Sequence, residues 1–115
     1  MNHSTDDDLL LVEPELVRDV PLALERAATR HAEAARAVEA RLGTRGEHPM
    51  DMFRLSPILR PPCVLLVLAV LYRGAAGGGS QQCARKADVY AQRYETAMKM
   101  ARLELSKLYR RRRHA

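Results

Sequence analysis

The second half of the chain joins a proline-bounded apolar run to a glycine-rich loop and a long basic segment. The run reads PPCVLLVLAVLY from Pro61 to Tyr72, and the loop reads GAAGGGS from Gly74 to Ser80. From Gln81 to Arg113 the sequence follows one helical pattern. Because proline favours helix starts and glycine favours helix ends, this order predicts a helical hairpin with a charged end.

The apolar run is too short to cross a bilayer by itself. Only the ten residues from Cys63 to Tyr72 lie between the charges of Arg60 and Arg73, whereas a membrane span needs about 20 residues. Since the run is apolar on every face, we predict a central helix that its own domain or neighbouring copies cover. We expect no membrane partner.

The C-terminal helix has one apolar stripe, and its basic residues lie mostly off that stripe. A helix of about 30 residues spans about 45 Å, which is longer than a small three-helix core can cover, so its end should project. We expect helix packing between the two hairpin helices at Leu66, Val70, Tyr90, Tyr94, Ala101 and Leu105.

The N-terminal half predicts an arm followed by one helix. The arm is acidic and apolar, is interrupted by Pro14, and should contact other subunits through Leu10, Leu11 and Val12. Asp19 can cap the next helix, which Pro21 opens and Gly43 ends. The apolar face of that helix is expected at Leu24, Ala28, His31, Ala35, Val38 and Leu42.

The fold class predicted from these segments is all-α: a small helical bundle with a long C-terminal helix and an extended N-terminal arm. Residues 1–18 form the arm, residues 19–110 the helical domain and residues 111–115 a basic tail. A short amphipathic segment, Asp51 to Leu59, is expected as a lid before a central helix that starts at Pro61.

Charge is distributed unevenly along the chain. Residues 1–51 carry 11 acidic and 6 basic side chains, whereas residues 52–115 carry 3 acidic and 13 basic ones. A chain with opposite charges in its two halves can associate with copies of itself, or bridge an acidic and a basic surface.

The sequence offers no recognisable catalytic or metal-binding motif. The Gly74–Ser80 loop lacks the lysine of a phosphate-binding loop and follows a predicted helix where that motif follows a strand. Cys63 and Cys83 lack zinc-ligand spacing, and along the hairpin axis they should be too far apart for a disulfide. We therefore predict no enzyme, no metal, no cofactor and reduced thiols.

Three segments, in this order, resemble a known family. They are LLLVEPELVRDVP (Leu9 to Pro21), LSPILRPPCVLLVLAVLYRGAA (Leu55 to Ala76) and KADVYAQRYETAMKMARLEL (Lys86 to Leu105). Their order is similar to that of small head-completion, or head–tail adaptor, proteins of tailed bacteriophages. In those proteins an apolar helix with an LYR-type end precedes a helix with a K-A-x-x-Y-x-x-x-Y pattern. The resemblance covers about half of the chain.

The resemblance implies a structural virion protein in the neck of the particle, assembled in the host cytoplasm. Copies would form a ring below the portal protein, extend the DNA channel and support the next neck or tail protein. Because the C-terminal segment of such adaptors docks on the portal, the candidate docking residues are Leu108, Tyr109, Arg110, Arg111, Arg112 and Arg113.

Two other classes remain open on the residues alone. In the first, the arginines at the helix end bind nucleic acid, because such groups neutralise phosphates without reading sequence. In the second, the chain is a small helical regulatory protein that dimerises through the Leu24 to Leu42 stripe.

Overall fold

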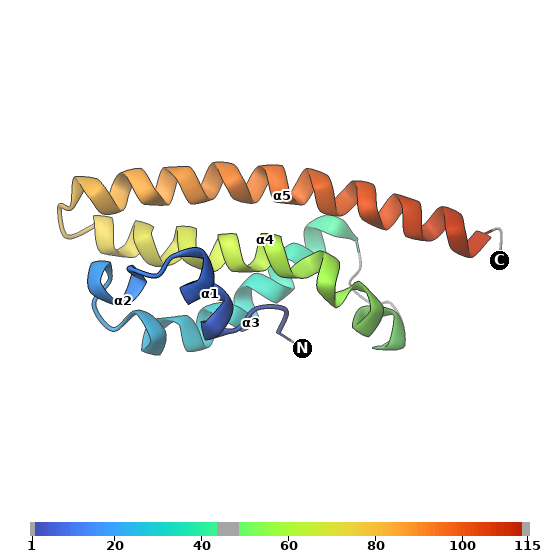
Figure 1. Cartoon of the computed structure of the whole chain (residues 1–115), viewed down its shortest axis with the longest axis horizontal. Coiled ribbons are helices and arrows are strands. Elements are labelled where there is room, and N and C mark those ends of the chain that lie inside the picture. Colours follow the sequence, from blue (N-terminus) through green and yellow to red (C-terminus); the bar gives the residue numbers. More distant parts are fainter. Residues whose placement is uncertain (1, 44–48, 114–115) are drawn as a thin grey trace.

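The computed structural model describes the backbone of residues 2–43 and 49–113, and the side chains of residues 2–43 and 57–108. Within these ranges the chain is helical and contains no strand, which confirms the all-α class (Figure 1). The helices are α1 (Asp6–Val12), α2 (Leu16–Asp19), α3 (Ala23–Leu42), α4 (Pro49–Ala76) and α5 (Gln81–Arg113).

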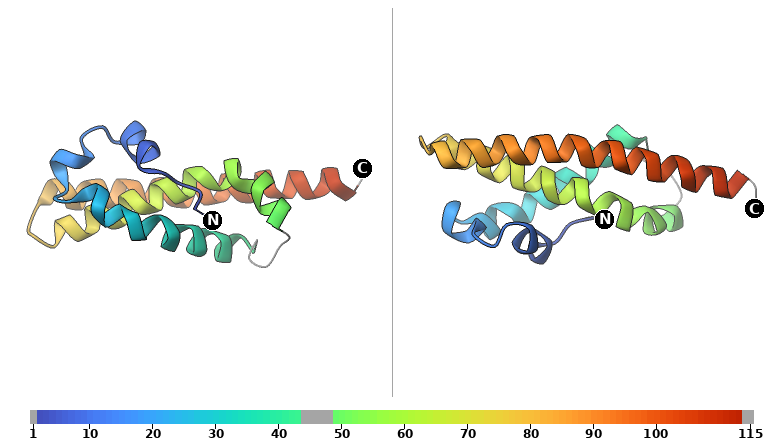
Figure 2. Two further views of the ribbon diagram at one scale, coloured as in Figure 1. Left: turned by 90° about the horizontal axis from the view of Figure 1, so that it is seen from below. Right: turned by 45° about the horizontal axis from the view of Figure 1, so that its top comes forward.

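Helices α4 and α5 form the predicted hairpin, and α3 packs along α4 on another side (Figures 1 and 2). The turn uses Gly79 with a φ of 97°, a conformation that glycine adopts without steric cost. The Ser80 hydroxyl accepts a hydrogen bond from the amide of Cys83 at 3.2 Å, so Ser80 caps α5 as expected. The molecule is elongated, 52 × 23 × 21 Å, with α5 along its length (Figure 1).

Helix α4 begins at Pro49, so the prediction that the central helix starts at Pro61 was wrong. Pro57, Pro61 and Pro62 all lie inside the helix, although each lacks the amide hydrogen of a normal helical bond. Burial compensates for this cost, because Leu59 and Cys63 have no exposed surface. The expected Asp51–Leu59 segment is therefore part of α4, and the lid side chains Met52, Phe53 and Leu55 lie outside the described side chains.

Because α4 is continuous, it contains a longer apolar stretch than the ten residues on which the sequence prediction about a membrane span was based. The 20 residues of Pro57–Ala76 have a mean hydropathy of 1.6, so by length and composition this stretch is able to span a bilayer. However, 56% of that stretch is buried inside the fold. Its buried side chains contact α1, α3 and α5, which is how the core helix of a helical bundle packs.

The N-terminal segment is not an extended arm, because it forms α1 and α2 and folds back on the other helices (Figure 2). Thr5 and Asp8 form a reciprocal capping box at the start of α1, with bonds of 2.9 and 3.2 Å. Leu9 and Leu16 are fully buried and anchor the two helices in the core. Burial of these leucines offsets the entropy lost on ordering the segment.

Helix α3 starts and packs differently from the expectation. Leu22, with a φ of 56°, precedes its first residue, and Asp19 does not cap it because Asp19 ends α2. Ala28 is exposed, whereas Ala23, Ala27 and Ala34 are buried, so the buried face is rotated toward these residues. His31, Ala35 and Val38 are buried as predicted, Leu24 and Leu42 are half-buried, and Gly43 ends the helix with a φ of 73°.

Candidate functional site

The far end of α5 carries the predicted docking residues. The helix continues to Arg113, beyond the part of the bundle that α3 reaches (Figure 1). Leu108 is half-buried against the hydrophobic core. Tyr109 and Arg110 to Arg113 lie on the helical backbone, and their side chains are outside the described ones. Cations at a helix C-terminus interact favourably with the helix dipole.

Most predicted packing positions of the hairpin are in the core. Tyr90, Tyr94, Ala101 and Leu105 are buried, and Leu66 is half-buried. Val70 is 39% exposed, so its assignment to the α4–α5 contact was wrong. The run around Val70 is apolar on all faces, and its sequence therefore contains no signal for which face meets α5.

The three residues expected to contact other subunits lie on α1 with graded exposure. Leu10 is half-buried and packs against the core, Val12 is 37% exposed and Leu11 is 81% exposed. Leu11 is therefore an apolar side chain that α1 presents to its surroundings.

A cluster of charged groups, which we name the Lys86 cluster, joins the N-terminal segment to α5. It consists of Lys86, Glu13, Glu15, Asp19, Tyr72 and Tyr90. The Lys86 ammonium lies 2.9 Å from Oε1 of Glu13 and 2.6 Å from Oδ2 of Asp19. The hydroxyls of Tyr90 and Tyr72 donate to the same two carboxylates, each at 2.8 Å. The cluster thus connects α2 and the residues just before it to α4 and α5 through neutralised and hydrogen-bonded groups.

The pKa values of the cluster reflect this pairing. Burial alone would raise the pKa of Glu13 and of Asp19, but hydrogen bonds from Lys86 and a tyrosine outweigh it, so both pKa values are lowered. Burial together with the hydrogen bond to Glu13 raises the pKa of Tyr90 to about 12. At neutral pH Glu13 and Asp19 are therefore ionised and Tyr90 is protonated.

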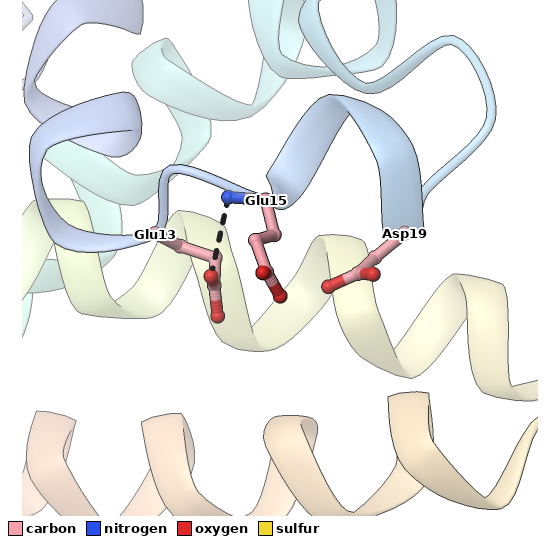
Figure 3. A group of neighbouring side chains, drawn as sticks. All are labelled: Glu13, Glu15 and Asp19. Atoms are coloured by element: carbon pink, nitrogen blue, oxygen red, sulfur yellow. Dashed lines mark hydrogen bonds between the residues drawn. The ribbon is translucent and has the colours of Figure 1, made fainter.

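The three carboxylates are close enough together to resemble a cation site. Oxygens of Glu13, Glu15 and Asp19 lie within 4.8 Å of one another, on α2 and the residues just before it (Figure 3). The Lys86 ammonium contacts two of these carboxylates directly and lies 3.8 Å from Glu15. An ammonium there supplies the positive charge that a cation would otherwise bring, so we interpret the cluster as structural.

A second polar contact fixes the residues before α1. His31 of α3 is buried, and its Nε2 lies 2.8 Å from Oδ1 of Asp6. Since a carboxylate only accepts, Nε2 donates, and in the neutral tautomer Nδ1 accepts the Ser4 hydroxyl at 2.6 Å. His3 contacts Glu39 of α3 at 2.7 Å. His31 is thus a packed histidine that orders the N-terminus.

No family model, curated protein or solved structure matches this chain.

Sequence reasoning did not find the Lys86 cluster. Lys86 belongs to a basic helix and its acidic partners lie more than 60 positions earlier. The only local signal was that acidic residues flank Pro14 in a segment rich in leucine. That composition also fits an exposed arm, so it does not indicate which lysine the acids would meet.

Proposed function

We propose that this chain is a head–tail adaptor of a tailed bacteriophage, a structural virion protein without catalytic activity. Copies would form a ring between the portal and the next neck or tail protein, around the DNA channel. The proposal starts from the resemblance of three sequence segments to that family. The structural observation that supports it best is the continuation of α5 to Arg113, past the reach of α3.

The projecting end of α5 suits docking on an acidic protein surface. Arg110 to Arg113 are four consecutive like charges on α5, and like charges this close in sequence repel one another. Such a cluster is favourable in a contact only where carboxylates face it. We therefore assign the portal contact to Arg110 to Arg113, with Leu108 anchoring the helix to its own core.

The test compares two variants that lose the same charge. One replaces Arg110 to Arg113 with glutamine, and the matched control replaces four exposed bases of the body, Arg26, Arg36, Lys99 and Arg102, with glutamine. We expect the first variant to lose binding to purified portal rings and incorporation into particles, while the control retains both. Normal incorporation of the first variant would contradict the portal contact.

Direct binding of DNA is the second candidate function. Exposed bases along α5, including Arg85, Lys99 and Lys107, support it. In a salt series on a generic duplex, four phosphate contacts at the tip predict a log–log slope near −3.6, a value of about 0.9 per contact. If replacing Arg110 to Arg113 with glutamine removes this salt dependence of DNA binding and leaves portal binding unchanged, the result favours DNA binding as the function of these arginines over portal docking.

The regulatory-dimer alternative loses its proposed interface. Part of the α3 face on which it depended is covered within one copy, with Val38 fully buried and His31 and Ala35 nearly so. A pairing surface has to be accessible before the partner arrives.

A further inference from the structure

An open groove lies between α4 and α5. It has a volume of about 720 Å³, with Pro61 and Leu65 on the α4 side and Arg93, Ala97 and Met100 on the α5 side. A second hollow of about 260 Å³ shares Pro61, Leu65 and Arg93 with it and extends to Leu11 and Val12 of α1. Together they form a mainly apolar surface that side chains of the same copy leave uncovered.

The α5 wall of this groove belongs to a second periodic stripe, distinct from the buried one. We name it the outer stripe, and it consists of Val89, Arg93, Thr96, Met100, Leu103 and Lys107. Its 4-3-4-3-4 spacing is that of a helix–helix seam. Val89, Met100 and Leu103 are 51%, 55% and 56% exposed. Three of the six stripe positions are thus apolar and open to solvent, and exposed apolar side chains on one face of a helix indicate a surface for another helix.

Charge limits which helix can occupy this surface. The outer stripe contains the bases Arg93 and Lys107, and Arg85 lies one turn before Val89. Among the described lining residues, the acidic side chains are Glu104 in the groove and Asp8 in the second hollow, and Arg60 and Arg93 are the basic ones. Two outer stripes facing each other would bring like charges together, which is unfavourable. The surface therefore suits an apolar helix with acidic flanks.

Helix α1 of a second copy has this chemistry. Its first turn carries Asp6, Asp7 and Asp8, and its last turn contains no base. Leu11, 81% exposed, follows Asp7 by four positions, so the two share one face of the helix. Asp6 is engaged with His31 of its own copy, whereas Asp7 is exposed and faces outward.

We propose that α1 of one copy docks on the groove and outer stripe of the next copy. Leu11 enters the groove beside Met100, and the exposed Asp7 faces Arg93 of the stripe. The contact is heterologous, because one copy supplies α1 and the other supplies α5, and repetition of such a contact generates a ring or a filament. The inference deepens the proposed adaptor function and rests on it, since it names the contact between ring subunits.

The first experiment measures association by sedimentation velocity, up to about 1 mM protein, where even millimolar contacts are populated. We expect the unmodified chain to form species larger than a dimer. Leu11→Glu and Met100→Glu should each weaken association at least about 10-fold, because each brings an unpaired charge into an apolar contact. The matched control is Val17→Glu, since Val17 is a 57% exposed residue of α2 outside both hollows; it should associate normally.

The second experiment mixes the two single variants. Leu11→Glu leaves every residue that lines the larger groove unchanged, because Leu11 lines only the second hollow. Met100→Glu leaves α1 unchanged, so the mixture contains one unaltered groove and one unaltered α1. The mixture should form a one-to-one dimer and nothing larger, whereas each variant alone should associate at least about 10-fold more weakly than the mixture. Three outcomes would overturn the proposal. The mixture could remain monomeric, the unmodified chain could form a dimer and nothing larger, or the unmodified chain could stay monomeric at about 1 mM.

The same variants test self-association and the proposed adaptor function independently. Circular dichroism checks that the variants remain folded, which we expect because Leu11 and Met100 are exposed. Portal binding is then measured on the same samples. Portal binding by a chain that does not self-associate through Leu11 and Met100 would reject the α1 contact and leave the adaptor function standing. Self-association through Leu11 and Met100 without portal binding would support the α1 contact and contradict the adaptor function.

Discussion

Lys86 of α5 donates to Asp19 of α2 at 2.6 Å, although 67 positions separate the two residues in the chain. The bond is part of the Lys86 cluster and holds α2 against the hairpin. Side chains of Lys86 and Asp19 are 23% and 7% exposed, so water screens the pair only weakly. The N-terminal segment therefore belongs to the folded body and presents α1 in a defined position.

Lys86→Met should lower the free energy of unfolding by about 3 kcal/mol. Removal of the ammonium leaves two poorly hydrated carboxylates close together without their cation, and such losses are large for buried pairs. Lys107→Met is the matched control, because Lys107 is 63% exposed and lies 3.9 Å from Glu104; it should cost less than about 0.5 kcal/mol. Urea denaturation measures both, and equal costs would contradict a structural role for the cluster.

The same cluster predicts a loss of stability in acid. The pKa values of Glu13 and Asp19 are lowered from 4.5 and 3.8 in the fold. Their contribution is therefore fully present above these ordinary values and is lost as the pH falls below them. The double variant Glu13→Gln, Asp19→Asn should be less stable at neutral pH and should lose less stability between about pH 7 and about pH 3. Urea titrations across that range test this, and parallel curves for the two proteins would refute it.

The sequence predicted those features that a repeating pattern determines. The α5 stripe was correct at Tyr90, Tyr94 and Leu105 because polar residues separate its apolar ones. In α4 the apolar residues have no such contrast, which explains the error at Val70. Pro61 suggested a helix start because proline favours that position locally, but burial on both sides of it keeps the helix continuous. The Lys86 cluster depends on how α2 folds back, and no local pattern contains that information.

Tyr94→Ala should destabilise the fold by about 3 kcal/mol, because truncation of a buried aromatic side chain leaves a cavity. Tyr94 is 7% exposed, and the Arg41 guanidinium lies 5.3 Å from the centre of its ring. Gln92→Ala, an exposed change two positions away, should cost less than about 0.5 kcal/mol. Thermal melts of the two variants give the comparison; similar melting temperatures would show that α5 packs through a different face.

Both thiols should be unreactive in the native state. Cys63 is fully buried and Cys83 is 5% exposed, and burial raises the pKa of Cys63 to about 12. A buried thiol reacts slowly with alkylating reagents, and the raised pKa of Cys63 slows it further because it lowers the fraction of thiolate. Mass spectrometry after iodoacetamide treatment should show no adduct in buffer and two in urea. A Val89→Cys variant, modified at a half-exposed position, should gain one adduct in buffer and confirms that the reagent is active.

Pro61→Ala should stabilise the protein by about 1 to 2 kcal/mol. Pro61 is exposed and lies inside α4, where proline is about 3 kcal/mol less favourable than alanine because it removes an amide donor and crowds the preceding turn. Part of this gain is offset because alanine makes the unfolded chain more flexible. Pro62→Ala gives the contrast: Pro62 is almost fully buried, so the loss of its ring from the core should cancel most of the backbone gain. Urea denaturation should therefore rank Pro61→Ala above both Pro62→Ala and the unmodified chain. A less stable Pro61→Ala variant would mean that α4 depends on a bend at this residue.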